Sequence, residues 1–124
     1  MKKTLLVIAF CSCGFPLSMH QRAEAATQPS HWYYCNGAEI QNDKNTYYST
    51  TFSSSTDSGT LFRDFSNYVS QHYDVPVNGL TGVCYGARPY KSDTFQGVED
   101  QRSQDMTQSS KHGKNVIPTG WAGQ

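Results

Sequence analysis

Cys35 and Cys84 are the residues whose chemistry is most narrowly limited by the sequence around them. A metal site would need further ligands, and the histidines of this region are scattered without the spacing of a zinc site. A cysteine nucleophile would need a reduced thiol, which an oxidising compartment disfavours. We therefore expect a Cys35–Cys84 disulfide, with free or intermolecular thiols as the alternative, and we expect no metal and no cofactor.

Acid–base catalysis would need a histidine and a carboxylate that converge within hydrogen-bond reach. The candidates are His31 and His72 together with Asp64, Asp74, Glu99, Asp100 and Asp105. Asp64 and His72 are about two turns apart on one predicted helix, so they would not touch. His72 and Asp74 are close in sequence but lie at a helix end. No serine lies in a G-x-S-x-G motif, so we expect no catalytic residue.

The segment "YGARPYKS", 85–92, combines glycine with Arg88 and Lys91. This composition suits a phosphate contact, but the glycine spacing of a P-loop is missing. We expect Arg88 and Lys91 to lie in a solvated turn.

The sequence is rich in tyrosine and tryptophan after residue 30, and leucine and isoleucine are few there. These rings either form the core or form a recognition surface, because tyrosine and tryptophan bring a large contact area at low entropy cost. For a recognition surface the candidates are Trp32, Tyr47, Tyr90 and Trp121.

The first 25 residues have the pattern of a secretory signal peptide. Lys2 and Lys3 precede a short apolar run, and Ala23 and Ala25 supply the small residues that a signal peptidase reads. The apolar run is shorter than the roughly 20 residues of a membrane span. An uncut anchor, or a lipoprotein acylated at Cys11 or Cys13, is the less favoured alternative. We expect export to the periplasm or beyond the cell.

Residues 26–30 form a polar leader, and residues 31–124 are long enough for one small domain. After residue 25 there are seven basic and nine acidic residues without a basic cluster. This balance disfavours binding to nucleic acid. We expect no membrane span in this part and a monomeric protein.

Periodicity predicts the order β-β-α-β-α-β. The strands are predicted at 31–35, 46–53, 80–87 and 115–121, and the helices at about 60–73 and 93–112. Ser58 or Thr60 is expected to cap the first helix, and Asp93 with Gln96 the second. In the strand 46–53, Tyr48, Thr50 and Phe52 are expected on one face.

The predicted fold class is α+β: a small, mainly antiparallel sheet with two helices packed on one face and one disulfide. The first and third strands are expected to be neighbours, joined by the bridge. The favoured function is a small exported, non-catalytic binding protein of the bacterial envelope, such as an inhibitor, an immunity-type protein or an accessory factor. Its partner would be a protein or a glycan. The alternatives are a small secreted hydrolase with a His/Asp pair and a structural module of a secreted complex.

Overall fold

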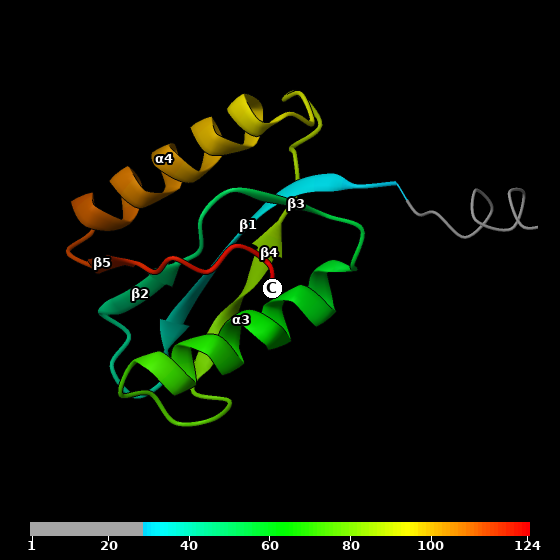
Figure 1. The fold of residues 1–124 in the computed structure, drawn as a ribbon. Coiled ribbons are helices and arrows are strands. Elements are labelled where there is room, and N and C mark those ends of the chain that lie inside the picture. Colours follow the sequence, from blue (N-terminus) through cyan, green and yellow to red (C-terminus); the bar gives the residue numbers. More distant parts are fainter. Residues whose placement is uncertain (1–28) are drawn as a thin grey trace, which may run out of the picture.

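The computed structural model describes residues 29–124 (Figure 1). The predicted signal peptide, with Cys11 and Cys13, and most of the polar leader lie outside the described residues. Seven elements follow in chain order. They are β1 (His31–Glu39), β2 (Asn45–Tyr48), β3 (Phe52–Ser54), α3 (Ser58–His72), β4 (Leu80–Tyr85), α4 (Phe95–Lys111) and β5 (Asn115–Pro118).

Strand β1 is the centre of a mixed, five-stranded sheet. It pairs antiparallel with β2 and β3 along one edge of the strand and with β4 along the other. Strand β5 is added parallel to β2. The fold class is therefore α+β as predicted, and three of the four strand pairs are antiparallel.

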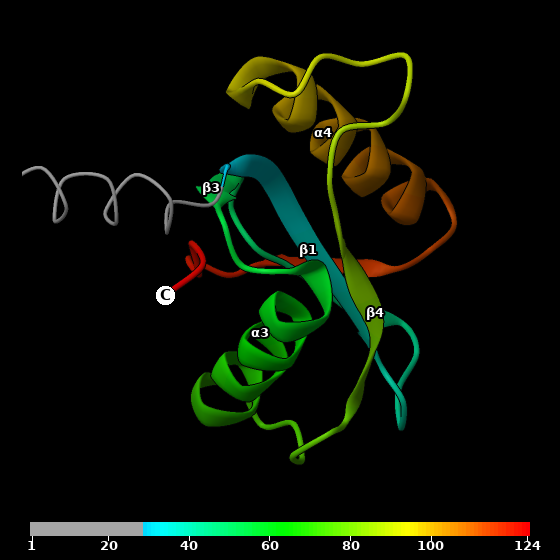
Figure 2. The ribbon, with the colours of Figure 1, turned by 90° about the vertical axis from the view of Figure 1, so that its right-hand side faces the viewer.

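The two helices cover opposite faces of the sheet (Figure 1, Figure 2). This arrangement corrects our expectation that both helices pack on one face. Neighbouring residues of a strand point to opposite faces, and Tyr34 and Cys35 of β1 are both fully buried. Cys35 lies in the cluster beneath α3, whereas Tyr34 packs with Val98 of α4. The uninterrupted aromatic run in β1 thus belongs to a strand that is covered on both faces.

Helix α3 packs through the apolar face that its periodicity predicted. Leu61, Phe65 and Val69 are buried in a cluster that also holds Cys35 and Trp121. The cap differs from the prediction, because Asp57 accepts the hydrogen bond from the Thr60 amide at 3.0 Å. Aspartate is among the best N-cap residues, since its side-chain oxygen reaches an amide that has no partner within the helix.

The predicted strand 46–53 is two short strands, β2 and β3, with an irregular step between them. Tyr48 lies in the cluster on the α4 side, whereas Phe52 lies in the cluster on the α3 side. Strict alternation would have placed both rings on one face. The step is held at Ser49, whose amide donates to the carbonyl of Cys35 and whose hydroxyl accepts from the amide of Cys35.

The disulfide joins Cys35 and Cys84, as the sequence predicts. The two residues lie directly opposite each other in the register of β1 and β4. This bridge is compatible with an oxidising compartment. Within residues 29–124, no helix has the length and hydropathy needed to cross a membrane.

Candidate functional site

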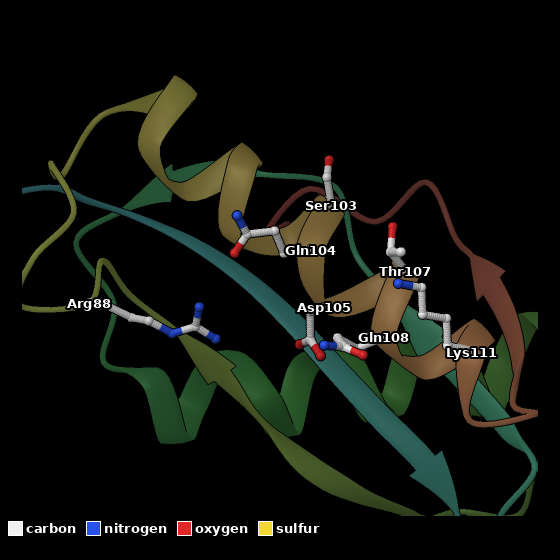
Figure 3. A pocket seen from close by; sticks show the side chains of 7 residues that line it. All are labelled: Arg88, Ser103, Gln104, Asp105, Thr107, Gln108 and Lys111. Atoms are coloured by element: carbon white, nitrogen blue, oxygen red, sulfur yellow. The ribbon is translucent and has the colours of Figure 1, made fainter.

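A pocket of about 560 Å³ opens on α4 and the segment that follows β4 (Figure 3). Three of its lining residues are charged: Arg88, Asp105 and Lys111. The others are uncharged, hydrogen-bonding residues of α4: Ser103, Gln104, Thr107 and Gln108. The volume falls in the range of roughly 300–1,000 Å³ that is usual for ligand pockets, although the lining is more polar than usual.

Arg88 is positioned by a buried side chain of α4. Gln101 is fully buried, and its Oε1 accepts the backbone amide of Arg88 at 2.9 Å. Its Nε2 donates to the carbonyl of Gly86 at 3.1 Å. The segment that carries Arg88 is therefore fixed to α4. The expected turn is present, because the Arg88 carbonyl accepts the amide of Lys91 at 2.9 Å, but Arg88 is half-buried rather than fully solvated. The only sequence signal for Gln101 is its position three residues after Val98, on the buried face of the helix.

Asp105 is held by two donors from β1. Its Oδ2 accepts the hydroxyl of Tyr34 at 2.8 Å and the side-chain amide of Asn36 at 2.9 Å. Burial, and next the hydrogen bond to Asp105, raise the pKa of Tyr34 far above its usual range. Tyr34 thus stays protonated and remains a donor. The other carboxylate oxygen, Oδ1, has no hydrogen-bond partner within residues 29–124, so it is available to a ligand.

Tyr85 of the edge strand β4 is linked to the site through Tyr34, although it does not itself line the pocket. Its ring stacks on Tyr34 with centroids 5.3 Å apart and planes inclined by 29°. Tyr34 is fully buried, whereas Tyr85 is 36% exposed. A partly exposed aromatic ring is therefore packed on the tyrosine that also holds Asp105.

The pocket carries one net positive charge from its own side chains. Arg88 and Lys111 are cationic, and Asp105 is the single carboxylate of the lining. Figure 3 shows Arg88 and Lys111 at opposite ends, with Asp105 between them. Within the described part of the chain, neither cation has a carboxylate oxygen within 4.0 Å. Their charges are thus available to an anionic group of a ligand.

The four predicted surface aromatics are not brought together. Tyr47 and Trp121 are buried, at 4% and 3% exposure, so for these two the core interpretation replaces the surface one. Trp32 is half-buried and meets Phe95 edge-to-face, with centroids 5.6 Å apart. Tyr90 is 78% exposed. Trp32 and Tyr90 remain candidates for a binding surface, and Phe95, which is 48% exposed, joins them.

His31 pairs with Asp93, a carboxylate that the sequence assigned to a helix cap. The His31 Nδ1 and Asp93 Oδ2 atoms are 2.7 Å apart, and the other Asp93 oxygen accepts the amide of Trp32 at 2.9 Å. These two bonds hold the pKa of Asp93 below its usual value. The cap of α4 is Thr94 instead, which accepts the amide of Gly97 at 3.0 Å.

His72 has no carboxylate partner in the structure of residues 29–124. Its Nδ1 donates to the carbonyl of Tyr68 at 2.9 Å, and its ring stacks on the Tyr68 ring at 4.0 Å. The same described residues contain no group of three His, Cys, Asp or Glu side chains arranged to hold a metal ion. Of the acid–base candidates, only His31 lies against a carboxylate, and that pair is exposed on both sides.

Comparison with family models, curated proteins and solved structures found no match to this chain. The function proposed below therefore depends on the sequence and on the geometry of the site.

Proposed function

We propose that this chain is an exported, non-catalytic binding protein of the bacterial envelope, and that it binds through the α4 pocket. The observation that supports the proposal best is that both Arg88 and Asp105 are held in place by hydrogen bonds from neighbouring residues. Arg88 is tethered through Gln101, and Asp105 through Tyr34 and Asn36. A binding site gains affinity when its polar groups are already ordered before the ligand arrives.

The exposed aromatic rings extend this surface beyond the pocket. Trp32 and Phe95 pack together at the start of α4, and Tyr90 lies in the loop that leads to it. Exposed aromatic side chains of this kind act as anchors in protein interfaces. An inhibitor, an immunity-type protein or an accessory factor would use the rings for a protein partner and the pocket for a charged group of that partner.

The test is capture from the native host with a chain that carries its own N-terminal region and a C-terminal tag. The variants are Arg88→Ala in the pocket and Trp32→Ala in the aromatic cluster. Arg63→Ala is the matched control, because Arg63 is an exposed arginine of α3, on the opposite side of the sheet. We expect one stoichiometric partner or glycan with the wild type and with Arg63→Ala, and a loss of at least about tenfold with Arg88→Ala. Equal capture by all variants would contradict the proposed site.

A small secreted hydrolase is the second candidate, and the His31–Asp93 pair is the observation that favours it. A histidine oriented by a carboxylate is a common general base. If the protein is a hydrolase, it should turn over a polymeric envelope substrate. His31→Ala should abolish this turnover and leave the unfolding midpoint unchanged. Turnover that survives in His31→Ala would rule this candidate out.

A further inference from the structure

We propose that the α4 pocket binds a saccharide that carries a carboxylate group. This inference deepens the proposed function and rests on it, because it names the ligand class of the same site.

The charge of the pocket favours a single negative charge on the ligand. Arg88 and Lys111 lack ion-pair partners in the described structure, and Asp105 leaves the lining with a net charge of one. A carboxylate is a monoanion, and its two oxygens match the paired N–H donors of a guanidinium. A phosphate monoester brings more charge and would therefore be repelled more strongly by Asp105.

The remaining groups of the pocket suit neighbouring hydroxyls. Oδ1 of Asp105 is the acceptor that remains, and the carboxylate is fixed because its Oδ2 is held by Tyr34 and Asn36. Gln104 and Gln108 each offer an amide with donors and acceptors on the same side of α4 (Figure 3). A side-chain amide can accept from one hydroxyl and donate to the next, whereas the ionised carboxylate of Asp105 can only accept. A sugar ring presents several neighbouring hydroxyls around its edge, and each can donate and accept.

Tyr85 supplies the apolar contact that a sugar ring needs. The ring is 36% exposed and is backed by the buried ring of Tyr34. An aromatic ring that is apolar on its face and polar at its tip suits a ligand with C–H groups on one side and hydroxyls at its rim. Tyr85, Asp105 and Arg88 together therefore match the three parts of an acidic sugar: ring face, hydroxyls and carboxylate.

The decisive experiment compares pairs of sugars that differ in the carboxylate alone or nearly so. N-acetylmuramic acid is N-acetylglucosamine with a lactyl ether that carries a carboxylate, and glucuronic acid is glucose whose C6 hydroxymethyl group is oxidised to a carboxylate. Binding to the folded chain is measured by calorimetry or by NMR chemical shifts at neutral pH. We expect at least one acidic member to bind at least about tenfold more tightly than its neutral partner.

Single-residue variants test which side chain binds the carboxylate of the ligand and which contacts its sugar ring. Arg88→Ala should remove the preference for the acidic sugar, and Arg88→Lys should restore part of it, because lysine keeps the charge without the planar fork. Tyr85→Ala should weaken acidic and neutral sugars alike. Arg63→Ala on α3 should bind as the wild type does, and thermal unfolding of each variant checks that it is folded.

Four outcomes would overturn the inference in different ways. If acidic and neutral sugars bind equally well, the pocket does not recognise the carboxylate. Inorganic phosphate that binds through Arg88 as tightly as the acidic sugar would make the pocket a general anion site. If no sugar binds while a protein partner is captured in an Arg88-dependent manner, the ligand class is wrong and the proposed function stands. If neither sugar nor partner is bound, both fail.

Discussion

Gln101 is the single residue on which the position of Arg88 depends most. It is fully buried and makes two hydrogen bonds to the backbone of residues 86 and 88. Gln101→Ala would leave the partly buried amide of Arg88 and the partly buried carbonyl of Gly86 without their partner. We expect the free energy of unfolding to fall by roughly 1–3 kcal/mol, as measured by urea denaturation.

The matched control for this prediction is Gln96→Ala in the same helix. Gln96 is exposed and bonds only to Asp100, one turn further along. Its replacement should change the stability by less than about 0.5 kcal/mol. A loss of similar size in both variants would show that the buried glutamine does not hold the segment.

Because of Tyr47, the free energy of unfolding is expected to change with pH in the alkaline range. Burial, and next a hydrogen bond to Glu39, raise the pKa of Tyr47 from 10.0 to about 12. Between these two values the unfolded chain loses the phenol proton and the folded chain keeps it. The unfolded state therefore binds fewer protons, and stability must fall as the pH rises through this window.

We expect Tyr47→Phe to lower the stability at neutral pH, because one hydrogen bond is lost, and to make the decline above pH 10 shallower. Denaturation curves at intervals between pH 9 and 12 would measure both effects. Tyr90→Phe, which removes a hydroxyl from a side chain that is 78% exposed, is the control. An unchanged pH slope in Tyr47→Phe would contradict the assignment of this stability to Tyr47.

The sequence identified some residues of the site by type but could not predict that they lie together. Asp105 was recognised as a carboxylate and Arg88 as a cation, but nothing in their spacing shows that they face one pocket. Asp105 is positioned because α4 packs over β1, which lies about 70 positions earlier in the chain, and Arg88 joins it because Gln101 of α4 binds the segment after β4. Such long-range convergence leaves no periodic trace in one sequence.

The β1–β4 pair requires a glycine at position 82. Gly82 lies opposite Gly37 in the register of the two strands. A Cβ on Gly82 would collide with the carbonyl oxygen of Asn36, and it would come within 2.8 Å of the Cα of Gly37. The strands thus approach each other closely because Gly82 has no side chain.

Gly82→Ala should therefore destabilise the domain by about 1–3 kcal/mol, as forced overpacking does elsewhere. Gly120→Ala is the control, because a Cβ there would meet no atom within 4 Å. Thermal and urea unfolding of the two variants measure the difference. Equal stability of the two variants would argue against the close β1–β4 approach.

Apart from the division of the predicted strand 46–53 into β2 and β3, the order and type of the elements followed from the sequence, because each carries a local signal. Helix α3 has a strong apolar stripe, and Pro118 ends β5, which lies at the edge of the sheet as proline requires. The side of the sheet on which each helix packs has no such signal. Helix α4 buries only Val98 and Gln101, so its sequence gave little indication of its face.

At the scale of the whole molecule, the disulfide and the pocket belong to different layers. Cys35 and Cys84 lie in the cluster under α3, whereas Arg88 and Asp105 are held from α4 and from the Tyr34 side of β1. The bridge closes a loop across a sequence separation of 49 residues. The chain-entropy model gives it about 4 kcal/mol, a large part of the roughly 5–15 kcal/mol of a typical domain.

We expect the double variant Cys35→Ala, Cys84→Ala to lose about 2–4 kcal/mol of stability and yet to bind the acidic sugar with nearly wild-type affinity below its unfolding midpoint. The reason is that none of the hydrogen bonds that orient Arg88 and Asp105 involves a cysteine. Urea unfolding and calorimetric titration at low temperature measure the two quantities separately. If sugar binding disappears while the circular dichroism stays native, the bridge positions the site through β1, and the two layers act as one unit.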